Sequence, residues 1–295
     1  MIKGLAITPP VLGRISIGKV VEKNGKRLPE KDDEFTLTTQ VQSKGQWIKH
    51  PLDEELRQGD ASNKLRIIPI RLLFNDPDLN FRANYSMFDH KTGRPVCVGN
   101  GETCKRMTAQ GMATLPCPSP LACEYGQAGY CKAYGRLNVV IGDEDELGTF
   151  MFRTTGYNSI RTLLSRLHYF SAVSNNQLAS LPLALRIRGK STTQSFRQAI
   201  FYVDITTRPE HSLAQAIAIA TETNLNRQQA GFDQQGLDHA AKLGFANGEF
   251  EDTEDEGLEV VEEFYPVTEE TDGIAVQTTN GLKQRLQAKD TGAAP

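Results

Sequence analysis

Short runs of β-branched and apolar residues recur along the first 75 residues, which is typical of β-strands rather than helices. Two of these runs lie at residues 14–21 and 34–41. Between them, Asn24-Gly25 can adopt the positive φ angles that a hairpin turn requires. The pattern therefore predicts that the two segments pair as neighbouring strands.

Two further runs, at residues 46–50 and 64–74, also read as strands. Pro69 interrupts the second run. Because proline has no N–H to donate to a sheet ladder, we expect it at a sheet edge or at a bend. The single tryptophan, Trp47, has no stripe of basic residues around it, so we expect it in the core rather than as a platform for a nucleic-acid base.

The middle of the chain predicts a hairpin followed by a helix. Residues 136–142 and 148–155 are rich in β-branched and aromatic side chains and flank an acidic turn. Asn158 can cap the helix that follows. Four apolar residues then recur at helical spacing, namely Ile160, Leu163, Leu164 and Leu167. Arg161 and Arg166 fall outside this apolar stripe.

Residues 184–190 combine strand periodicity with positive charge. Three cations alternate with uncharged residues and so share one face of a strand: Arg186, Arg188 and Lys190. The partner strand, at residues 196–205, adds Arg197 and several aromatic side chains. These four cations are candidate nucleic-acid-binding residues, because a basic strand face beside aromatics suits a groove that follows a nucleic-acid backbone. The alternative is an ordinary water-facing strand.

An alanine-rich stretch at residues 211–246 predicts two helices, broken near Gly231 or Gly236. Together these segments predict an α+β fold. The chain divides into four predicted regions: a β-rich N-terminal region at 1–95, an inserted cysteine loop that binds zinc at 96–135, an α+β region of hairpins and helices at 136–248, and a disordered acidic tail at 249–295.

The acidic tail changes the meaning of the formal net charge, which is −3. Residues 249–272 contain twelve Asp or Glu and no Lys or Arg, whereas residues 1–248 contain 30 basic and 23 acidic residues. A basic body with an acidic arm is seen in nucleic-acid-binding proteins, although such a stretch is also the usual composition of a solvated tail. Apolar residues such as Phe264 and Tyr265 stand among the carboxylates. The arm could therefore mimic DNA charge, recruit a partner or dock on the basic face of its own body.

No segment approaches the roughly 20 apolar residues of a membrane span, and the N-terminus lacks the features of a signal peptide. We therefore expect a cytoplasmic protein that does not bind a membrane. In that compartment its thiols should be reduced.

All five cysteines fall within residues 97–131, where glycines and prolines form turns that let distant thiols converge. Clustered cysteines in the cytoplasm more often bind metal than form disulfides. The alternatives are that these cysteines form disulfides or that they are simply small buried residues. We expect a closed, structural zinc site held by Cys104, Cys117, Cys123 and Cys131. Cys104 is chosen because Lys105 and Arg106 beside it favour a thiolate. Cys97 or His90 is the alternative fourth ligand.

Four short motifs stand out in and after the cysteine region: Cys104-Lys105-Arg106, Leu115-Pro116-Cys117-Pro118, Gly135-Arg136-Leu137-Asn138-Val139 and Phe152-Arg153-Thr154-Thr155-Gly156. This combination resembles the large recombination directionality factors of actinophages, which are partners of serine integrases. The resemblance covers about residues 10–170. It implies a zinc motif in the cysteine region and a protein that binds its integrase and redirects it from integration to excision.

The sequence favours a binding protein over an enzyme. It has no H-E-x-x-H, G-x-S-x-G or Walker motif, and the zinc deaminase signature fails because position 120, three residues after Cys117, is a proline. We expect a zinc-stabilised, non-catalytic accessory protein of mobile-element recombination that controls a recombinase or integrase, with single-stranded or duplex DNA as a further candidate partner. The alternatives are a single-strand-binding or annealing protein of a phage or conjugative element, and a metal-dependent hydrolase, a label that some related sequences carry.

Overall fold

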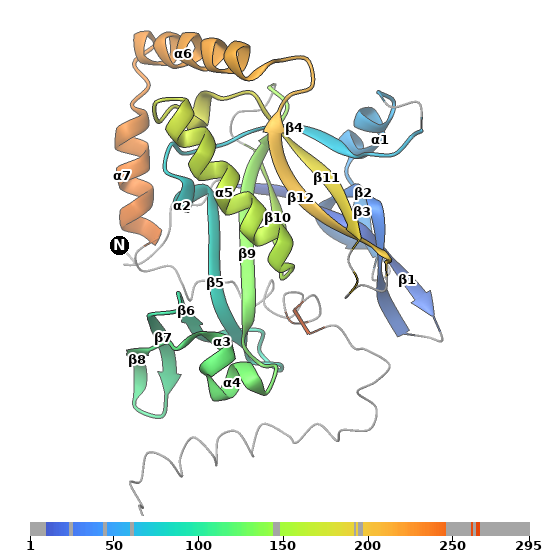
Figure 1. The fold of residues 1–295 in the computed structure, drawn as a ribbon, viewed down its shortest axis with the longest axis vertical. Coiled ribbons are helices and arrows are strands. Elements are labelled where there is room, and N and C mark those ends of the chain that lie inside the picture. The colour runs from blue at the N-terminus through green and yellow to red at the C-terminus, as the bar shows by residue number, and fades with distance from the viewer. Residues whose placement is uncertain are drawn as a thin grey trace, which may run out of the picture. The chain divides into compact units, whose positions relative to one another are not determined.

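The computed structural model describes residues 10–23, 26–43, 46–59, 62–143, 148–191, 193, 197–245, 261 and 264–265. The chain divides into two compact units, which are treated separately (Figure 1). Unit 1 comprises Met1–Ala83 and Ala133–Glu251, and unit 2 comprises Asn84–Lys132 and Asp252–Pro295. The predicted α+β class is confirmed. The predicted disordered tail lies almost entirely outside the described residues.

Unit 1 holds most of the strands, in chain order β1 (Val11–Lys23), β2 (Lys26–Ser43), β3 (Gln46–Lys49), β4 (Ile67–Arg71), β9 (Lys132–Ile141, of which the first residue belongs to unit 2), β10 (Thr149–Thr154), β11 (Leu183–Ser191) and β12 (Ala199–Thr207). Their order in the sheet is β3-β2-β1-β10-β9. At its C-terminal end β9 also pairs with β4, which continues to β11 and then β12. Among these pairs only β1 with β10 is parallel.

The three hairpins predicted from local sequence are confirmed. β1 and β2 pair with Lys23 opposite Lys26, and the Asn24-Gly25 turn predicted between them lies outside the described residues. β9 pairs with β10, and β11 with β12, in antiparallel register. The parallel pairing of β1 with β10 has no local signal in the sequence, because it joins segments that lie far apart in the chain.

Pro69 lies in β4, between β9 and β11, so the sheet edge suggested for it is wrong. The ladder with β9 begins one residue later, at Ile70. On that side Pro69 uses only its carbonyl oxygen, which accepts a hydrogen bond from the Gly142 amide at 3.0 Å. The missing N–H is therefore not needed there.

The helices of unit 1 are α1 (Pro51–Arg57), α2 (Pro77–Asn80), α5 (Tyr157–Val173), the short 3₁₀ turn η1 (Leu178–Ser180), α6 (Leu213–Gln229) and α7 (Gln234–Phe245). α6 begins with a capping box between Ser212 and Gln215. The predicted break after it occurs at Gly231, whose φ of 86° favours glycine, whereas Gly236 lies inside α7.

Helix α5 has the predicted apolar stripe but not the predicted cap. Ile160, Leu163 and Leu167 are buried. The capping residue is Gly156, whose amide donates to Thr154 Oγ1 at 3.0 Å. Asn158 lies two residues further along, within the first turn, and its side-chain oxygen accepts a hydrogen bond from Lys190 on β11.

The main core of unit 1 is one apolar cluster between the sheet and α5. Its fully buried members include Phe35, Leu37, Ile68, Ile70, Leu137, Val139, Leu163, Leu167, Leu183, Leu185, Val203 and Ile205. Trp47 is not part of this cluster, so the core position predicted for it is wrong. It is half-buried on β3, and the Arg14 guanidinium lies 4.0 Å from its ring centre.

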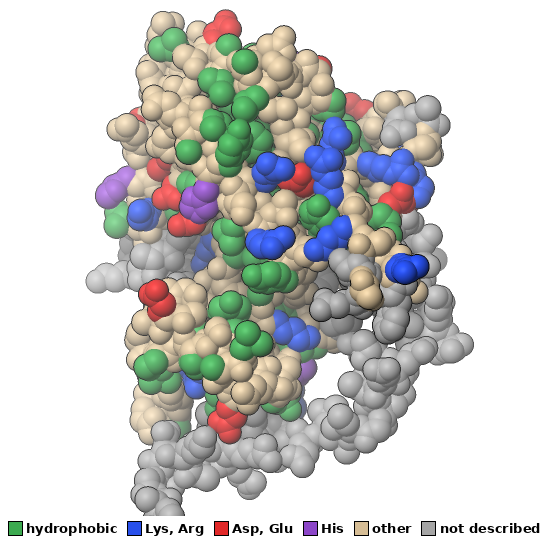
Figure 2. Space-filling model, in the orientation of Figure 1, with side chains coloured by type: hydrophobic (Ala, Val, Ile, Leu, Met, Phe, Trp, Pro, Cys, Tyr) green, Lys and Arg blue, Asp and Glu red, His purple; other side chains and the backbone are tan. Residues whose placement is uncertain are grey.

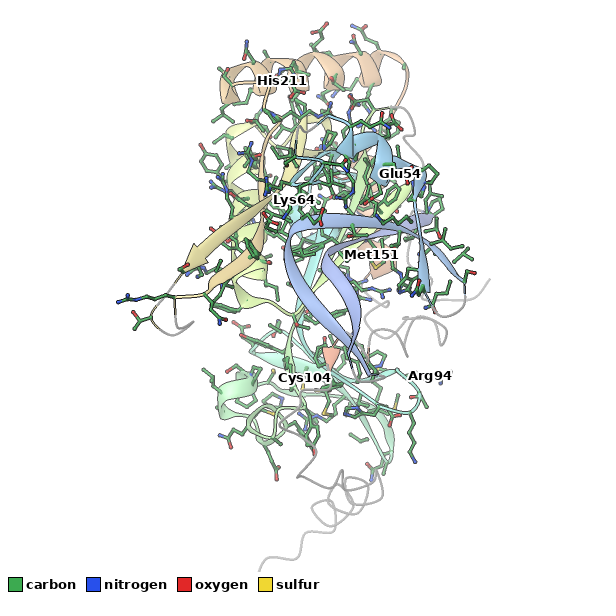
Figure 3. All side chains as sticks on the ribbon, turned by 90° about the vertical axis from the view of Figure 1, so that its right-hand side faces the viewer. Glu54, Lys64, Arg94, Cys104, Met151 and His211 are labelled. Atoms are coloured by element: carbon green, nitrogen blue, oxygen red, sulfur yellow. The ribbon has the colours of Figure 1, made fainter. Side chains whose placement is uncertain are left out.

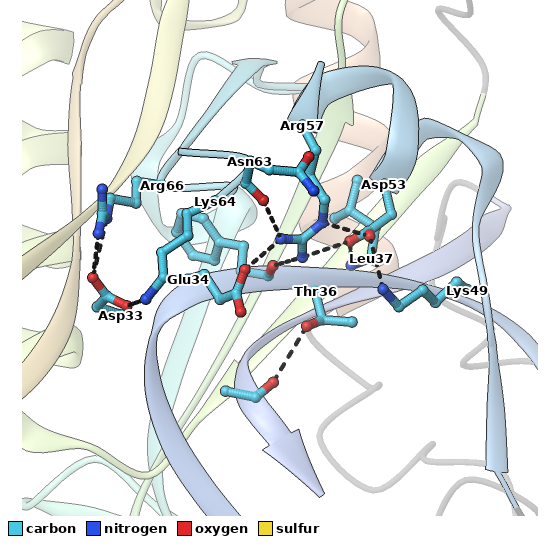
Figure 4. A network of polar contacts seen from close by, with 12 residues as sticks. Asp33, Glu34, Thr36, Leu37, Lys49, Asp53, Arg57, Asn63, Lys64 and Arg66 are labelled. Carbon is cyan, nitrogen blue, oxygen red and sulfur yellow. Dashed lines mark hydrogen bonds and ion pairs between the residues drawn. The ribbon is translucent and has the colours of Figure 1, made fainter. Parts of the chain in front are cut away.

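A polar network attaches α1 to the edge of β2 (Figure 4). Asp53 on α1 accepts hydrogen bonds from the Leu37 amide at 2.9 Å and from Arg57 Nε at 2.8 Å. Arg57 in turn donates to the Phe35 carbonyl at 2.7 Å and pairs with Glu34. The short helix is thus held by buried polar contacts in addition to apolar packing.

Unit 2 is a small antiparallel sheet followed by two short helices. Its elements are β5 (Phe81–Phe88, of which the first three residues belong to unit 1), β6 (Pro95–Gly99), β7 (Thr103–Thr108), β8 (Gly111–Pro116), α3 (Ser119–Ala122) and α4 (Glu124–Gln127). The strands pair in the order β5-β6-β7-β8. In the described part of the chain, no helix is long and apolar enough to cross a membrane.

Candidate functional site

All five cysteines gather in unit 2, and all five thiols are free. Cys97 lies on β6, and Cys104, which is labelled in Figure 3, lies on β7. Cys117 follows β8, Cys123 lies between α3 and α4, and Cys131 immediately precedes β9. Five segments thus bring their thiols to one region.

The strand register places the first two cysteines. On the small sheet Cys97 lies opposite Arg106, and Gly99 lies opposite Cys104. A Cβ atom added at Gly99 would come within 2.7 Å of Cys104 Cβ and 2.9 Å of Cys117 Sγ. Glycine is therefore required there because the side chains of Cys104 and Cys117 pack against its backbone.

The two short helices place the other cysteines by folding back tightly. A Cβ at Gly126 would lie only 2.1 Å from the Pro120 carbonyl oxygen, so α3 and α4 touch through their backbones. The Cys131 amide then donates to the Tyr125 carbonyl at 3.1 Å. This turn returns the chain toward the sheet and brings Cys123 and Cys131 to the same side as Cys97.

A small cavity lies at the centre of the cluster. It is lined by Tyr85, Met87, Cys97, Arg106, Cys117, Ser119, Cys123, Tyr125 and Cys131. Its volume of about 10 Å³ is close to the space that one water molecule requires. The cavity therefore suits a single small ion or a water molecule, and it has no room for a substrate.

Two of the predicted ligand candidates do not line the cavity. The Cys104 thiol points to the Pro116 carbonyl, 3.8 Å away. His90 is exposed and stacks on Tyr265, with 4.2 Å between ring centres. Cys97, named only as an alternative, does line the cavity.

Arg106 acts on Cys97 more directly than on Cys104. Its Nε lies 3.4 Å from Cys97 Sγ, and its guanidinium lies 4.7 Å from the centre of the Tyr125 ring. Burial and the neighbouring Cys97 raise the pKa of the Cys104 thiol to about 11, although the Arg106 charge acts in the opposite direction. The contact between Arg106 and Cys97 was not predicted from the sequence. Side chains alternate along β7 and so place Cys104 and Arg106 on one face, which is the pattern that could have indicated it.

The thiols also raise one another's proton affinity. Burial, followed by the charges of Cys97, Cys123 and Cys117, raises the pKa of the Cys131 thiol to about 12. Four thiols in so small a space cannot all ionise without a compensating positive charge. A bound cation would supply that charge, as would Arg106 in part.

Zinc fits the donor chemistry of this cluster. Within the described ranges, no group of three or more Cys, His, Asp and Glu side chains is arranged as ligands of a metal ion. Four thiols nevertheless surround one ion-sized cavity, and zinc prefers four such donors. Binding would require their sulfur atoms to turn toward a common point.

The candidate nucleic-acid residues lie on a basic face of unit 1. Figure 2 shows Lys and Arg side chains gathered over α5, β11 and β12. Arg188 and the α5 residue Arg166 both bind the buried Asp204, at 3.2 and 2.9 Å, and their side chains are 42% and 44% exposed. The carboxylate therefore fixes two arginines while leaving both accessible.

The other predicted cations differ in their surroundings. Lys190 donates to Asn158 at 2.7 Å, and Arg186 is half-buried opposite Asp204 in the sheet register. Arg197 is exposed in the turn before β12. The helix adds Arg161 and Arg166, which the sequence had marked only as lying outside the apolar stripe.

The chain was compared with known proteins. The family described as Gp3-like, recombination directionality factor-like, matches residues 12–208. This span includes all five cysteines and the strands from β1 to β12 apart from the first residue of β1. No curated protein and no solved structure matches the chain.

Proposed function

Because the chain belongs to the recombination directionality factor-like family, we propose that it controls a DNA recombinase of a mobile genetic element through protein contacts. In this role the protein redirects the recombinase from integration to excision. The observation that carries the proposal is the family match over residues 12–208, which spans most of the described sheet and the whole cysteine cluster.

A recombination assay tests this function. The recombinase encoded beside the gene would be purified and given either the two integration sites or the two junction sites that integration produces. We expect the protein to promote recombination of the junction sites and to suppress recombination of the integration sites. Unchanged direction and yield in both reactions would contradict the proposal.

We also propose that Cys97, Cys117, Cys123 and Cys131 hold one zinc ion. Their common cavity favours this set over the one that includes Cys104. When bound, zinc would supply a tetrahedral cross-link between segments that have little apolar core of their own. Arg106 would offset part of the negative charge of four thiolates. Such a closed site leaves no open position for the water that the hydrolase alternative needs.

Metal content of purified variants tests the ligand set. We expect about one zinc per chain in the wild type and in Cys104→Ser, and little or none in Cys97→Ser and Cys117→Ser. Thermal unfolding of unit 2 would be followed in parallel. Loss of zinc from Cys104→Ser with retention in Cys97→Ser would return Cys104 to the ligand set, and a zinc-free wild type with paired cysteines would remove the site altogether.

A second candidate function is direct DNA contact by the basic face. It is favoured by the accessible guanidiniums of Arg166 and Arg188, which are positioned by one buried carboxylate. Gel shifts with single-stranded and duplex DNA would compare Arg161→Ala/Arg197→Ala with Lys91→Ala, which removes an exposed cation from unit 2. We expect only the double variant to bind more weakly. Equal binding by both variants would argue against this face.

A further inference from the structure

The acidic segment has two aromatic residues that are docked on unit 2. Phe264 is only 1% exposed, and its ring meets Phe88 edge to face with 5.0 Å between centres. The Tyr265 hydroxyl donates to the Tyr130 carbonyl at 2.5 Å and accepts a hydrogen bond from the Phe88 amide at 3.4 Å. A solvated tail would leave both rings in water.

The surface that receives these rings also supplies positive charge. Lys132 Nζ donates to the Phe264 carbonyl at 3.3 Å and lies 5.2 Å from the Tyr265 ring centre. The His90 ring also packs against Tyr265, with 4.2 Å between the ring centres. Phe88, His90, Tyr130 and Lys132 together form what is called here the aromatic dock.

The dock combines two selective features. An apolar contact at Phe88 excludes water and suits a phenyl ring, whereas Lys132 and the two backbone groups suit a tyrosine in a negatively charged segment. The neighbouring sequence fits this chemistry, since residues 249–272 contain twelve carboxylates and no cation. Charge alone does not explain the contact, because the groups that are buried are the aromatic rings.

We propose that Phe264 and Tyr265 form a latch, which holds the chain's own acidic segment on the aromatic dock and withholds the dock from other peptides of the same chemistry. The latch is a tethered contact, and tethering gives it an effective concentration that a free peptide must exceed. It is small, two rings and three hydrogen bonds, so opening and closing remain in equilibrium. This inference does not depend on zinc or on the recombinase.

Peptide binding to full-length protein tests the latch. A fluorescent peptide with the sequence of residues 255–268 would be titrated into the wild type and into Phe264→Ala/Tyr265→Ala, and binding followed by anisotropy. We expect the variant to bind the peptide at least about tenfold more tightly than the wild type does, because the dock of the variant is empty. The same peptide with both aromatic residues replaced by alanine should not bind the variant.

A milder pair of variants keeps the test decisive if the double variant folds poorly. Tyr265→Phe removes only the hydroxyl that bonds Tyr130 and Phe88, so peptide binding should rise by a smaller factor. Tyr157→Phe is the matched control, because Tyr157 is 65% exposed on α5. Equal peptide binding by wild type and Tyr265→Phe, or equal binding of the aromatic and alanine peptides, would overturn the latch.

Discussion

Asp53 shows how a single buried carboxylate can be satisfied completely. Its side chain has no exposed surface, and its two oxygens accept from the Leu37 amide and from Arg57. Arg57 is nearly buried as well, with 11% of its side chain exposed. Lys49 also reaches Asp53, at 3.5 Å, but its side chain is 60% exposed (Figure 4). One carboxylate therefore has a buried partner and an exposed partner, which can be compared directly.

We predict that Asp53→Ala lowers the free energy of unfolding by about 3–5 kcal/mol, because it leaves the Arg57 guanidinium buried without its main partner. Lys49→Ala removes the exposed partner of the same carboxylate and should cost at most about 1 kcal/mol. Urea unfolding of both variants measures the difference. Similar losses in the two variants would mean that the buried Asp53–Arg57 pair contributes no more to the free energy of unfolding than the exposed Lys49 contact does.

The same carboxylates predict how stability depends on pH. Although burial opposes it, the hydrogen bonds from Arg57 and the Leu37 amide lower the pKa of Asp53, and hydrogen bonds from Arg208 lower the pKa of Asp143. The unfolded chain, in which an aspartate has a pKa of about 3.9, therefore binds protons more readily than the folded chain. Stability should be fully present above about pH 5 and should fall as the pH drops through the lowered pKa values.

Unfolding experiments between pH 7 and pH 3 test this expectation. The wild type should lose stability on acidification, and Asp53→Asn should start less stable at neutral pH but decline less steeply. A steeper acid decline in Asp53→Asn than in the wild type would show that Asp53 is not one of the linked groups.

At the scale of elements, local patterns predicted more than long-range pairing. The β1–β2, β9–β10 and β11–β12 hairpins and helix α5 follow from periodicity and turn residues. The interior position of Pro69 and the β1–β10 pair depend on strands that the sequence places far away. The cysteine cluster was predicted from spacing, but the choice between Cys97 and Cys104 depends on the β6–β7 register, which spacing does not contain.

The α3–α4 turn offers a test of close backbone contact. We predict that Gly126→Ala destabilises unit 2 by about 1–3 kcal/mol, because the added Cβ would overlap the Pro120 backbone and force the two helices apart. Cys123 lies at the junction of the two helices, so in Gly126→Ala its thiol should react faster with an aromatic disulfide reagent than it does in the wild type.

Gly59→Ala is the matched control for this change, because its added Cβ would meet only the Leu56 carbonyl, at an ordinary 3.6 Å. It should alter neither stability nor thiol reactivity appreciably. Wild-type reactivity at Cys123 in Gly126→Ala would show that the two helices can separate without exposing the cluster.

At the scale of the whole molecule, the charge division between body and arm is the dominant feature. Residues 1–248 carry an excess of seven positive charges, and residues 249–272 carry twelve negative ones. A covalently attached polyanion competes with nucleic acid for any basic surface that it can reach. If the basic face binds DNA, the arm would oppose that binding unless it is held elsewhere, and Phe264 and Tyr265 are held on the aromatic dock.

We predict that deleting residues 249–295 strengthens nucleic-acid binding. The salt dependence should also steepen, with each additional phosphate contact changing the logarithmic slope by about 0.9 on duplex DNA or about 0.7 on single strands. Replacing Arg186 and Arg188 by alanine in the truncated chain should reverse the gain. If truncated and full-length protein bind both kinds of DNA equally at all salt concentrations, the arm is not a competitor.

The parallel pairing of β1 with β10 has a consequence for the order of events during synthesis. Val11 lies opposite Thr149, so β1 leaves the ribosome long before that neighbour is synthesised. The β1–β2 hairpin can close early, and residues 84–132 can assemble their small sheet in the interval. Until residues 149–154 emerge, one edge of β1 remains without that neighbour, and an open edge is a template for pairing with another chain. Nascent chains that stall before residues 149–154 emerge should therefore pair with other chains through this edge of β1, whereas chains in which β10 has emerged should not pair there.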